Sequence, residues 1–369
     1  MSSHPENVQP AGYLDRMTRR QFMLAGAALA ATGALGHSIS RADTEATAPK
    51  ADAFALVDPE LRAVLQPWLK QNPTSDWSED NLPAMRRMVE SFTQPQLPYP
   101  PVIERTIRGR RGAPDVRVFV IGALSEGSAK AAVLHLHGGG YVAGTARQDI
   151  RSLQQLATTH DCVVVTVDYR LAPQVRFPGA LEDSYAALVW LYSNSRNLGV
   201  DPSRIVLLGE SAGGGLAATL AIAARDRAEV PIAMQILIYP MLDDRTGSIH
   251  AVPTHIGAFV WTAASNRFGW TSLLGVPAGA PSVPRGAVPA RVENLAGLPP
   301  TFIGTGAIDL FVREDVTYAQ RLLEAGVPTE LHVVPGAFHA FDVLAPQATV
   351  SKRFTAAWND ALARHIEAK

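Results

Sequence analysis

The sequence predicts an α/β fold in which a mostly parallel central sheet carries helices on both faces. Two observations support this prediction. From about residue 102 onward, short apolar runs alternate with stretches whose apolar residues recur at helical spacing. Most of the apolar runs beyond residue 130 are nearly unbroken Val, Ile and Leu, which is typical of parallel strands buried on both faces.

The individual elements can be predicted in chain order. Polar alternation predicts two half-exposed strands at the start, in VIERTIRG and DVRVFVIG. Continuous apolar runs predict the inner strands, which are KAAVLHLHG, DCVVVTVDYR, RIVLLGES, PIAMQILIYPM, PTFIGTGAID and TELHVVPG. Helical spacing, or a run of small apolar residues, predicts the intervening helices, which are RQDIRSLQQLATTH, GALEDSYAALVWLYSNSRNLG, AGGGLAATLAIAARDRA, EDVTYAQRLLEAG and VSKRFTAAWNDALARHIE.

Two segments interrupt this alternation. Residues 50–100 contain two predicted helices, VDPELRAVLQPWLK and NLPAMRRMVESF, and residues 245–295 are rich in Gly, Pro and Ala around a predicted helix in AFVWTAASNRFGWTSLL. Inserts beside the carboxyl edge of a sheet commonly form lids. We therefore expect a cap built from residues 50–100 and 245–280, with a covering for a sheet edge as the alternative.

Residues 1–42 resemble a bacterial twin-arginine export signal and are set apart from the domain at 43–369. The pair Arg19-Arg20 precedes a run of small apolar residues that is too short to span a bilayer, and SISRAD then offers small residues for cleavage. An amphipathic first helix is the alternative, but the run has no polar face. We expect a periplasmic or secreted protein, without a stable membrane anchor because no cysteine stands at the cleavage point.

Composition excludes several classes of function. With 47% hydrophobic and 18% charged residues and a net charge of −1, the chain is typical of a globular protein and does not favour nucleic acid as a partner. The single cysteine, Cys162, starts a predicted buried strand and is expected to pack rather than react. No cluster of Cys and His stands out, so we expect no metal and no cofactor.

The stretch VLLGESAGGGLAA carries the chemistry. It places Ser211 between Gly209 and Gly213 in a G-x-S-x-G motif, where a predicted strand turns sharply into a helix. A nucleophilic serine on such a turn has a strained backbone, and the flanking glycines keep its neighbours from clashing. The helix that starts at Ala212 directs its N–H groups at the reaction centre. The motif therefore predicts a serine nucleophile.

A serine hydroxyl needs a base that a carboxylate orients, in the chain order Ser, Asp or Glu, His. Of the downstream histidines, only His339 follows the carboxyl end of a predicted strand, whereas the others lie in the insert, a strand or the last helix: His250, His255, His332 and His365. Asp309 follows the preceding strand and is the predicted acid. Asp342, close to His339 in sequence, is the alternative.

Three consecutive glycines follow the strand in VLHLHGGGYVAG. Attack on a carbonyl creates an oxyanion that needs preorganised donors, and one is the N–H group of Ala212, directly after the nucleophile. The other is expected from the loop after the third strand, which is where HGGG lies. A phosphate-binding loop is the alternative, but no Lys follows the glycines.

These motifs together resemble the hormone-sensitive-lipase-like family of bacterial esterases, a branch of the α/β hydrolases. The match runs from about Leu82 to Arg364 and includes HGGG, DYRLAP, GESAGG, YPMLD and GAFHAF. By this resemblance the catalytic triad is Ser211, Asp309 and His339, the oxyanion donors are Gly138, Gly139 and Ala212, and the supporting residues are His137, Asp168 and Arg170.

The chain departs from the family pattern at two places. Glu210 stands where many relatives have Asp or Thr, and its side chain is expected to point away from the attack. The segment GAIDLF lacks the acidic residue that relatives more often have at Ala307, and it also lacks a proline after Asp309. Asp309 is nevertheless well placed after its strand.

The expected function is hydrolysis of short-chain acyl esters by a serine carboxylesterase, through an acyl-enzyme and without a cofactor. An amidase or lactonase with the same triad is one alternative. A non-catalytic ligand-binding member of the superfamily is another, although such members typically lose the histidine. The expected partner is a small-molecule ester, and homodimerisation through an exposed sheet edge stays open.

Overall fold

The computed structural model describes residues 53–72, 76–123 and 129–366, so the predicted export signal at 1–42 lies outside the described residues. The described strands form an eight-stranded sheet in the order β1-β2-β4-β3-β5-β6-β7-β8. Their bounds are β1 (Val102–Ile107), β2 (Val116–Ile121), β3 (Lys130–Leu136), β4 (Val163–Asp168), β5 (Val200–Glu210), β6 (Met234–Ile238), β7 (Thr301–Gly306) and β8 (Thr329–Val334).

The sheet is mostly parallel, as predicted. Strand β1 pairs antiparallel with β2, and β2 pairs antiparallel with β4. Every other pairing in the sheet is parallel. The two strands whose sequence alternates in polarity are therefore the antiparallel ones at one side of the sheet, and the continuous apolar runs form the parallel part.

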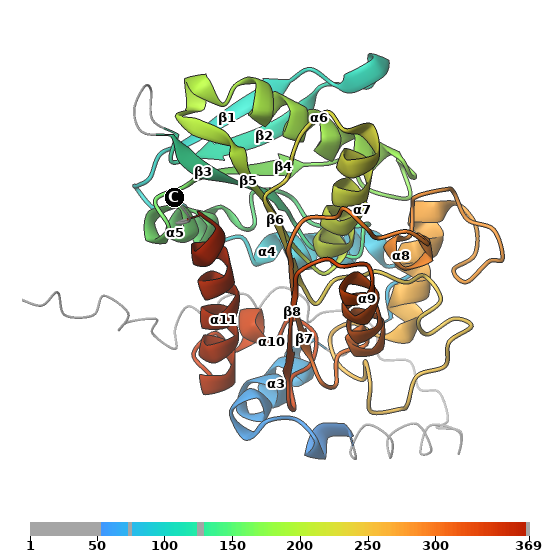
Figure 1. Ribbon diagram of the computed structural model, residues 1–369. Helices are drawn as coiled ribbons and strands as arrows, with labels where there is room; N and C mark the ends of the chain where they lie inside the picture. Colours follow the sequence, from blue (N-terminus) through green and yellow to red (C-terminus); the bar gives the residue numbers. More distant parts are fainter. Residues whose placement is uncertain (1–52, 73–75, 124–128, 367–369) are drawn as a thin grey trace, which may run out of the picture. The chain divides into compact units, whose positions relative to one another are not determined.

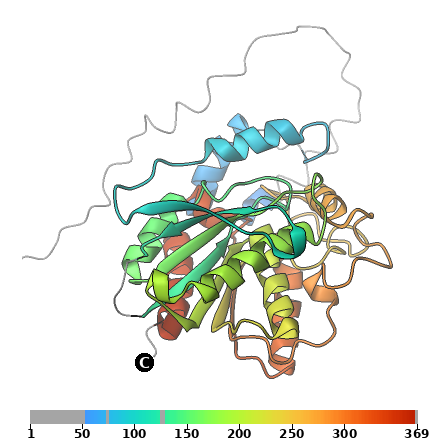
Figure 2. The same cartoon turned by 90° about the horizontal axis from the view of Figure 1, so that it is seen from above.

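Helices connect the successive strands from β3 to β8, as predicted. Their bounds are α3 (Pro59–Gln71), α4 (Leu82–Ser91), α5 (Ile150–Thr159), α6 (Gly179–Ser193), α7 (Ala212–Arg227), α8 (Ala263–Leu274), α9 (Val312–Glu324), α10 (Phe341–Leu344) and α11 (Thr349–Ile366). Figure 1 shows α5 and α11 on one face of the sheet and α6, α7 and α9 on the other. The same layering is visible from above in Figure 2.

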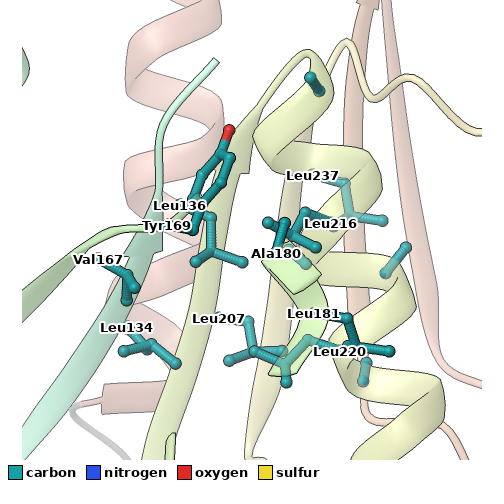
Figure 3. Close-up of a cluster of buried hydrophobic side chains, with 14 of the residues drawn as sticks. Leu134, Leu136, Val167, Tyr169, Ala180, Leu181, Leu207, Leu216, Leu220 and Leu237 are labelled. Atoms are coloured by element: carbon teal, nitrogen blue, oxygen red, sulfur yellow. The ribbon is translucent and has the colours of Figure 1, made fainter. Parts of the chain in front are cut away.

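The core consists of two layers, one on each face of the sheet. Alternate residues of a strand enter different layers: Leu134 and Leu136 of β3 pack toward α6 and α7, whereas Val133 packs toward α5 and α11. Figure 3 shows the first layer, where leucines of β3, β5 and β6 meet side chains of α6 and α7. All of these strand residues are fully buried, which is why the inner strands read as continuous apolar runs.

The start of helix α7 lies close to the sheet because its first turn consists of small residues. A Cβ atom at Gly213 would stand 2.0 Å from the carbonyl oxygen of Leu136, and one at Gly209 would stand 2.3 Å from the carbonyl oxygen of Gly213. Only glycine permits these approaches. The close packing fixes the turn between β5 and α7 against the end of β3.

Two elements are shorter than their sequence pattern. Strand β6 ends at Ile238 although the apolar run continues, because Tyr239 has a φ of 35° and turns the chain away. Helix α8 starts only at Ala263, because Thr262 caps it by accepting a hydrogen bond from the N–H group of Ser265. The spacing of apolar residues predicts where the chain is buried, but it does not predict the backbone turns that end β6 and begin α8.

The two segments predicted to form a cap contact each other. The rings of Trp77 and Trp261 meet edge to face with centroids 5.4 Å apart. The N–H group of Trp77 donates to Ser265 Oγ over 3.0 Å, and Thr262 Oγ1 donates to Asp76. Among the described residues, no helix is both long and apolar enough to cross a bilayer.

Candidate active site

Ser211 stands at the turn between β5 and α7 with φ 56° and ψ −120°, a conformation that an L-residue rarely adopts. The turn is held by backbone hydrogen bonds, because the N–H group of Ser211 donates to the carbonyl of Ile238 over 2.8 Å and its own carbonyl accepts from Met241 over 2.9 Å. The residue is 8% exposed. The strained turn thus presents one hydroxyl at the carboxyl edge of the sheet.

His339 and Asp309 complete the predicted group. His339 Nε2 lies 2.9 Å from Ser211 Oγ, and His339 Nδ1 lies 2.8 Å from Asp309 Oδ2. Asp309 is fully buried, and its other oxygen, Oδ1, accepts the N–H group of Phe311 over 3.0 Å. Because Nδ1 donates to the carboxylate, Nε2 is left to accept the hydroxyl proton. The geometry is that of an activated serine.

The imidazole of His339 is also held by aromatic rings. Tyr239 meets it at a centroid distance of 4.8 Å, and Phe311 meets it edge to face at 5.2 Å. The hydroxyl of Tyr239 donates to Asp342 Oδ1 over 3.1 Å. Asp342, the alternative acid of the sequence, therefore bonds to Tyr239, while Asp309 bonds to the histidine. Burial raises the pKa of Asp342 to about 6.

Two further acidic residues stand in the first turn of α9, close to Asp309. Glu314 Oε1 accepts the N–H groups of Leu242 over 2.6 Å and Asp243 over 3.1 Å, which ties α9 to the loop after β6. Burial raises the pKa of both Glu314 and Asp315 well above the usual range, and the charge of Asp309 adds to this for Asp315. Asp309 therefore lies beside two buried carboxyl groups that resist ionisation.

The glycine loop lies directly beside Ser211. A Cβ atom at Gly138 would stand 3.6 Å from Ser211 Cβ, and one at Gly139, whose φ is 126°, would stand 2.1 Å from the carbonyl oxygen of Ala143. Within the described part of the chain, no hydrogen bond uses the N–H groups of Gly138, Gly139 or Ala212. The three predicted donors are therefore free of protein acceptors.

His137 supports the loop and is unsuited to act as a base. Its Nδ1 donates to the carbonyl of Gly138 over 2.8 Å, and its ring stacks on Tyr169 with centroids 4.1 Å apart. The hydroxyl of Tyr169 donates to the carbonyl of His137 over 2.7 Å. Burial lowers the pKa of His137 to about 4, so the ring is neutral at physiological pH. The predicted loop-tying hydrogen bond is present.

Asp168 and Arg170, the other two residues that the resemblance names as supports, bond to neighbouring segments. Asp168 Oδ1 accepts the N–H group of Ala146 over 3.1 Å, and its Oδ2 accepts from Arg117 Nε over 3.0 Å. Arg170 forms a bidentate pair with Asp183, with contacts of 2.7 and 2.8 Å. These bonds fix the segments that follow the glycine loop and β4.

Arg86 is a supporting residue that sequence reasoning missed. From α4 its guanidinium donates to the carbonyl of Val142 over 2.7 Å, to the carbonyl of Ala172 over 3.0 Å and to Gln174 Oε1 over 2.7 Å. It thereby ties the N-terminal segment to the loops beside the glycines. A lone arginine on a helix carries no signal for such contacts, because its acceptors are distant backbone carbonyls.

Two of the other downstream histidines lie in predicted elements, and the single cysteine directly precedes β4. His332 lies in β8 and His365 near the end of α11, as the sequence predicted. Cys162 is buried, and burial raises the pKa of its thiol to about 12, so it stays protonated.

Comparison with known proteins identifies the family. The sequence pattern of the α/β-hydrolase fold matches residues 133–343. The chain is 32% identical over 298 residues to Esterase LipI of Mycobacterium tuberculosis, which covers 79% of this chain and 91% of that protein. It is 34% identical over 215 residues to Ethyl acetate hydrolase of Pseudomonas putida, which covers 58% of this chain and 66% of that protein.

A solved structure agrees with these relatives. The structure titled Bacterial Heroin Esterase superposes with a TM-score of 0.76 at 34% sequence identity, covering 85% of this chain and 99% of that chain. The chain therefore belongs to the α/β-hydrolase-fold family of hormone-sensitive-lipase-like esterases, and it is a carboxylic-ester hydrolase.

Proposed function

We propose that the protein hydrolyses short-chain acyl esters through an acyl-enzyme on Ser211. The Ser211 oxygen attacks the ester carbonyl as His339 Nε2 takes its proton, and Asp309 holds the imidazole and stabilises its charge. His339 then gives the proton to the leaving alcohol. Water repeats the attack on the acyl-enzyme, the proton passes again through His339, and the free acid leaves with Ser211 restored.

One observation carries this proposal most directly. The chain of contacts from Ser211 Oγ to His339 Nε2 and from His339 Nδ1 to Asp309 measures 2.9 and 2.8 Å. Beside it stand the unbonded N–H groups of Gly138, Gly139 and Ala212, which the proposal assigns to the oxyanion. A binding module would need neither the strained serine nor these free donors.

Short acyl chains are proposed because aromatic side chains stand close over the glycine loop. A Cβ atom at Gly140 would be 2.2 Å from the Trp261 ring, and Trp261 packs against Trp77. The proposal gives these cap segments the role of closing the acyl pocket. The relative named Ethyl acetate hydrolase supports a two-carbon acyl group. Across p-nitrophenyl esters from acetate to dodecanoate, kcat/KM should peak at four carbons or fewer, and a maximum at eight or more would contradict the proposal.

Covalent labelling tests the serine assignment. A fluorophosphonate should add one phosphonyl group per chain, and peptide mapping should place it on Ser211. His339→Ala should slow labelling strongly, because the hydroxyl loses its base. Labelling at another serine, or none, would show that Ser211 is not the nucleophile.

Export is a separate proposal, which rests on the sequence of residues 1–42. The Arg19-Arg20 pair and the small-residue run support the twin-arginine route to the periplasm or beyond. Expression in a bacterium with this route should give a mature chain that starts near residue 43. The double change Arg19→Lys with Arg20→Lys should leave the full-length chain in the cytoplasm, and unchanged export would refute the route.

A further inference from the structure

A row of polar side chains crosses three strands on the face of the sheet that packs toward α5. His135 of β3 lies between Thr166 of β4 and Glu210 of β5. His135 Nδ1 is 2.9 Å from Thr166 Oγ1, and His135 Nε2 is 2.9 Å from Glu210 Oε2. The register explains the row, because His135 pairs directly with Thr166, and Leu208, two residues before Glu210, pairs with His135.

The contact between Glu210 and His135 joins the two segments that carry the proposed oxyanion donors. Glu210 directly precedes Ser211 and Ala212 at the end of β5, and His135 lies three residues before Gly138 on β3. The two segments touch there, since a Cβ atom at Gly138 would be 3.2 Å from the carbonyl oxygen of Glu210. A shift between the strand ends would therefore change the distance between donors that must act together.

The contact is buried on its His135 side. The His135 side chain is 1% exposed, while that of Glu210 is 30% exposed. Burial alone would lower the pKa of His135, but the charge of Glu210 and their hydrogen bond outweigh it and raise the pKa. A charge-assisted hydrogen bond in a poorly solvated site is worth more than a neutral one at the surface. As the sequence predicted, the Glu210 side chain turns away from the attack, and it has a partner there.

We propose that Glu210 and His135 are positioning residues that keep the serine turn and the glycine loop at the spacing the oxyanion needs. This inference rests on the proposed function, because it assumes that the N–H groups of Gly138, Gly139 and Ala212 receive the oxyanion. The contact depends on the length of the Glu210 side chain. An aspartate at this position, one methylene shorter, would not bring its carboxylate to His135 without moving the serine turn.

Three variants at one position test the inference. Glu210→Gln keeps the length and can still accept from His135 through its amide oxygen, so kcat should stay within about threefold of the wild type. Glu210→Asp and Glu210→Ala lose the contact, and kcat should fall about 10- to 100-fold with KM within about twofold, as a fraction of the loss seen when one oxyanion donor is removed.

A transition-state analogue separates positioning from a general structural role. A trifluoromethyl ketone adds to the serine and places an oxyanion against the same donors, so its affinity should fall in Glu210→Ala by the same factor as kcat/KM. Glu182→Ala is the matched control. It removes a partly buried carboxylate on α6 that pairs with Arg227 on α7, and it is remote in sequence from both strand ends. It should change neither kcat nor the analogue's affinity.

Three outcomes would overturn the inference. One is a Glu210→Ala variant that loses thermal stability but keeps kcat and analogue affinity. Another is a rise in KM with kcat unchanged. The third applies even if Glu210→Ala fails to fold. A larger loss of kcat in Glu210→Gln than in Glu210→Asp would show that the length of the Glu210 side chain, which brings it to His135, is not what matters. In each case, fluorophosphonate labelling of Ser211 in the wild type would leave the proposed function standing, and its absence would remove both.

Discussion

Gly139 is required by two features of its loop at once. Its φ of 126° is costly for an L-residue, and a Cβ atom there would stand 2.1 Å from the carbonyl oxygen of Ala143. Gly139→Ala must therefore move the loop and with it the donor N–H group. We expect kcat for p-nitrophenyl butyrate to fall about 10²- to 10³-fold, the loss typical of one missing oxyanion donor.

A second glycine provides the control for Gly139. Gly326 also has a positive φ, 76°, but a Cβ atom there would meet nothing within 4 Å. Gly326→Ala should lower the free energy of unfolding by about 1–2 kcal/mol through backbone strain alone and leave kcat unchanged. Equal kcat in the Gly139→Ala and wild-type enzymes would count against the loop as a source of donors.

Asp342 gives a pH dependence to stability. Burial raises its pKa in the folded protein to about 6 from a usual value of 3.8, so the folded state binds the proton more tightly than the unfolded state. The stability it contributes is fully present below pH 4 and is lost as the pH rises to 6. Asp342→Asn stays neutral and can still accept from the Tyr239 hydroxyl, which the native carboxyl does.

Thermal unfolding of both proteins between pH 4 and pH 8 measures this effect. The melting temperature of Asp342→Asn should match the wild type near pH 4 and exceed it by a few degrees above pH 6. The other buried acids titrate in both proteins, so their effects cancel when the melting temperature of the variant is compared with that of the wild type at the same pH. A variant that is less stable than the wild type at pH 8 would show that the ionised carboxylate is stabilising.

The residues of the candidate triad could be predicted because their signals are local. Ser211 sits in a motif of five residues, and His339 and Asp309 each follow a strand. The departure of GAIDLF from the family pattern has no visible consequence for Asp309. Its Oδ1 accepts from the backbone N–H group of Phe311, and every residue type except proline can supply such a donor. The contact of Glu210 with His135 on the neighbouring strand β3 could not be predicted, since it depends on register.

At the level of elements, Arg86 ties α4 to the loops that flank the glycines through three hydrogen bonds. Arg86→Ala removes a charged donor from two backbone carbonyls, so we expect the free energy of unfolding to fall by about 2 kcal/mol in urea titrations. Arg87, its exposed neighbour on the same helix, is the matched control. Arg87→Ala should change the free energy of unfolding by less than about 0.5 kcal/mol. Similar losses in both variants would contradict the claim that the Arg86 hydrogen bonds stabilise the attachment of α4.

The existence and type of the elements followed from the sequence more closely than their ends did. The run PIAMQILIYPM predicted a strand, but the positive φ of Tyr239 ends β6 at Ile238. The short helix α10 was not predicted, because it follows Ala340, whose φ of 57° is set by the loop that carries His339. Ends are decided by individual backbone conformations, which the spacing of apolar residues does not record.

At the scale of the whole molecule, the mostly parallel sheet with two covered faces was predicted, but the strand order was not. The placement of β4 between β2 and β3 requires contacts between distant segments, and the sequence offers no signal for their pairing. The two segments predicted to form a cap are a mixed case. Their helices were predicted, whereas the contact of Trp77 with Trp261 joins residues more than 180 positions apart in the sequence.

The domain should fold and act without the predicted export signal. The core and the candidate site described above lie within residues 53–366, so a chain that starts at residue 43 should have the melting temperature and kcat of the full-length protein. A chain that starts at residue 73 loses α3, whose Leu61 and Leu65 are fully buried. It should be destabilised by about 4 kcal/mol or more. A large loss of stability in the first truncation would contradict the proposed boundary.

Ser211→Ala tests the central claim most directly. The change removes one oxygen from a residue that is 8% exposed, so the melting temperature should stay within a few degrees of the wild type. If Ser211 is the nucleophile, kcat for p-nitrophenyl butyrate should fall by about 10⁴-fold or more, and no acyl-enzyme should be seen by intact-protein mass spectrometry. A folded Ser211→Ala enzyme that keeps wild-type turnover would show that ester hydrolysis takes place without this serine.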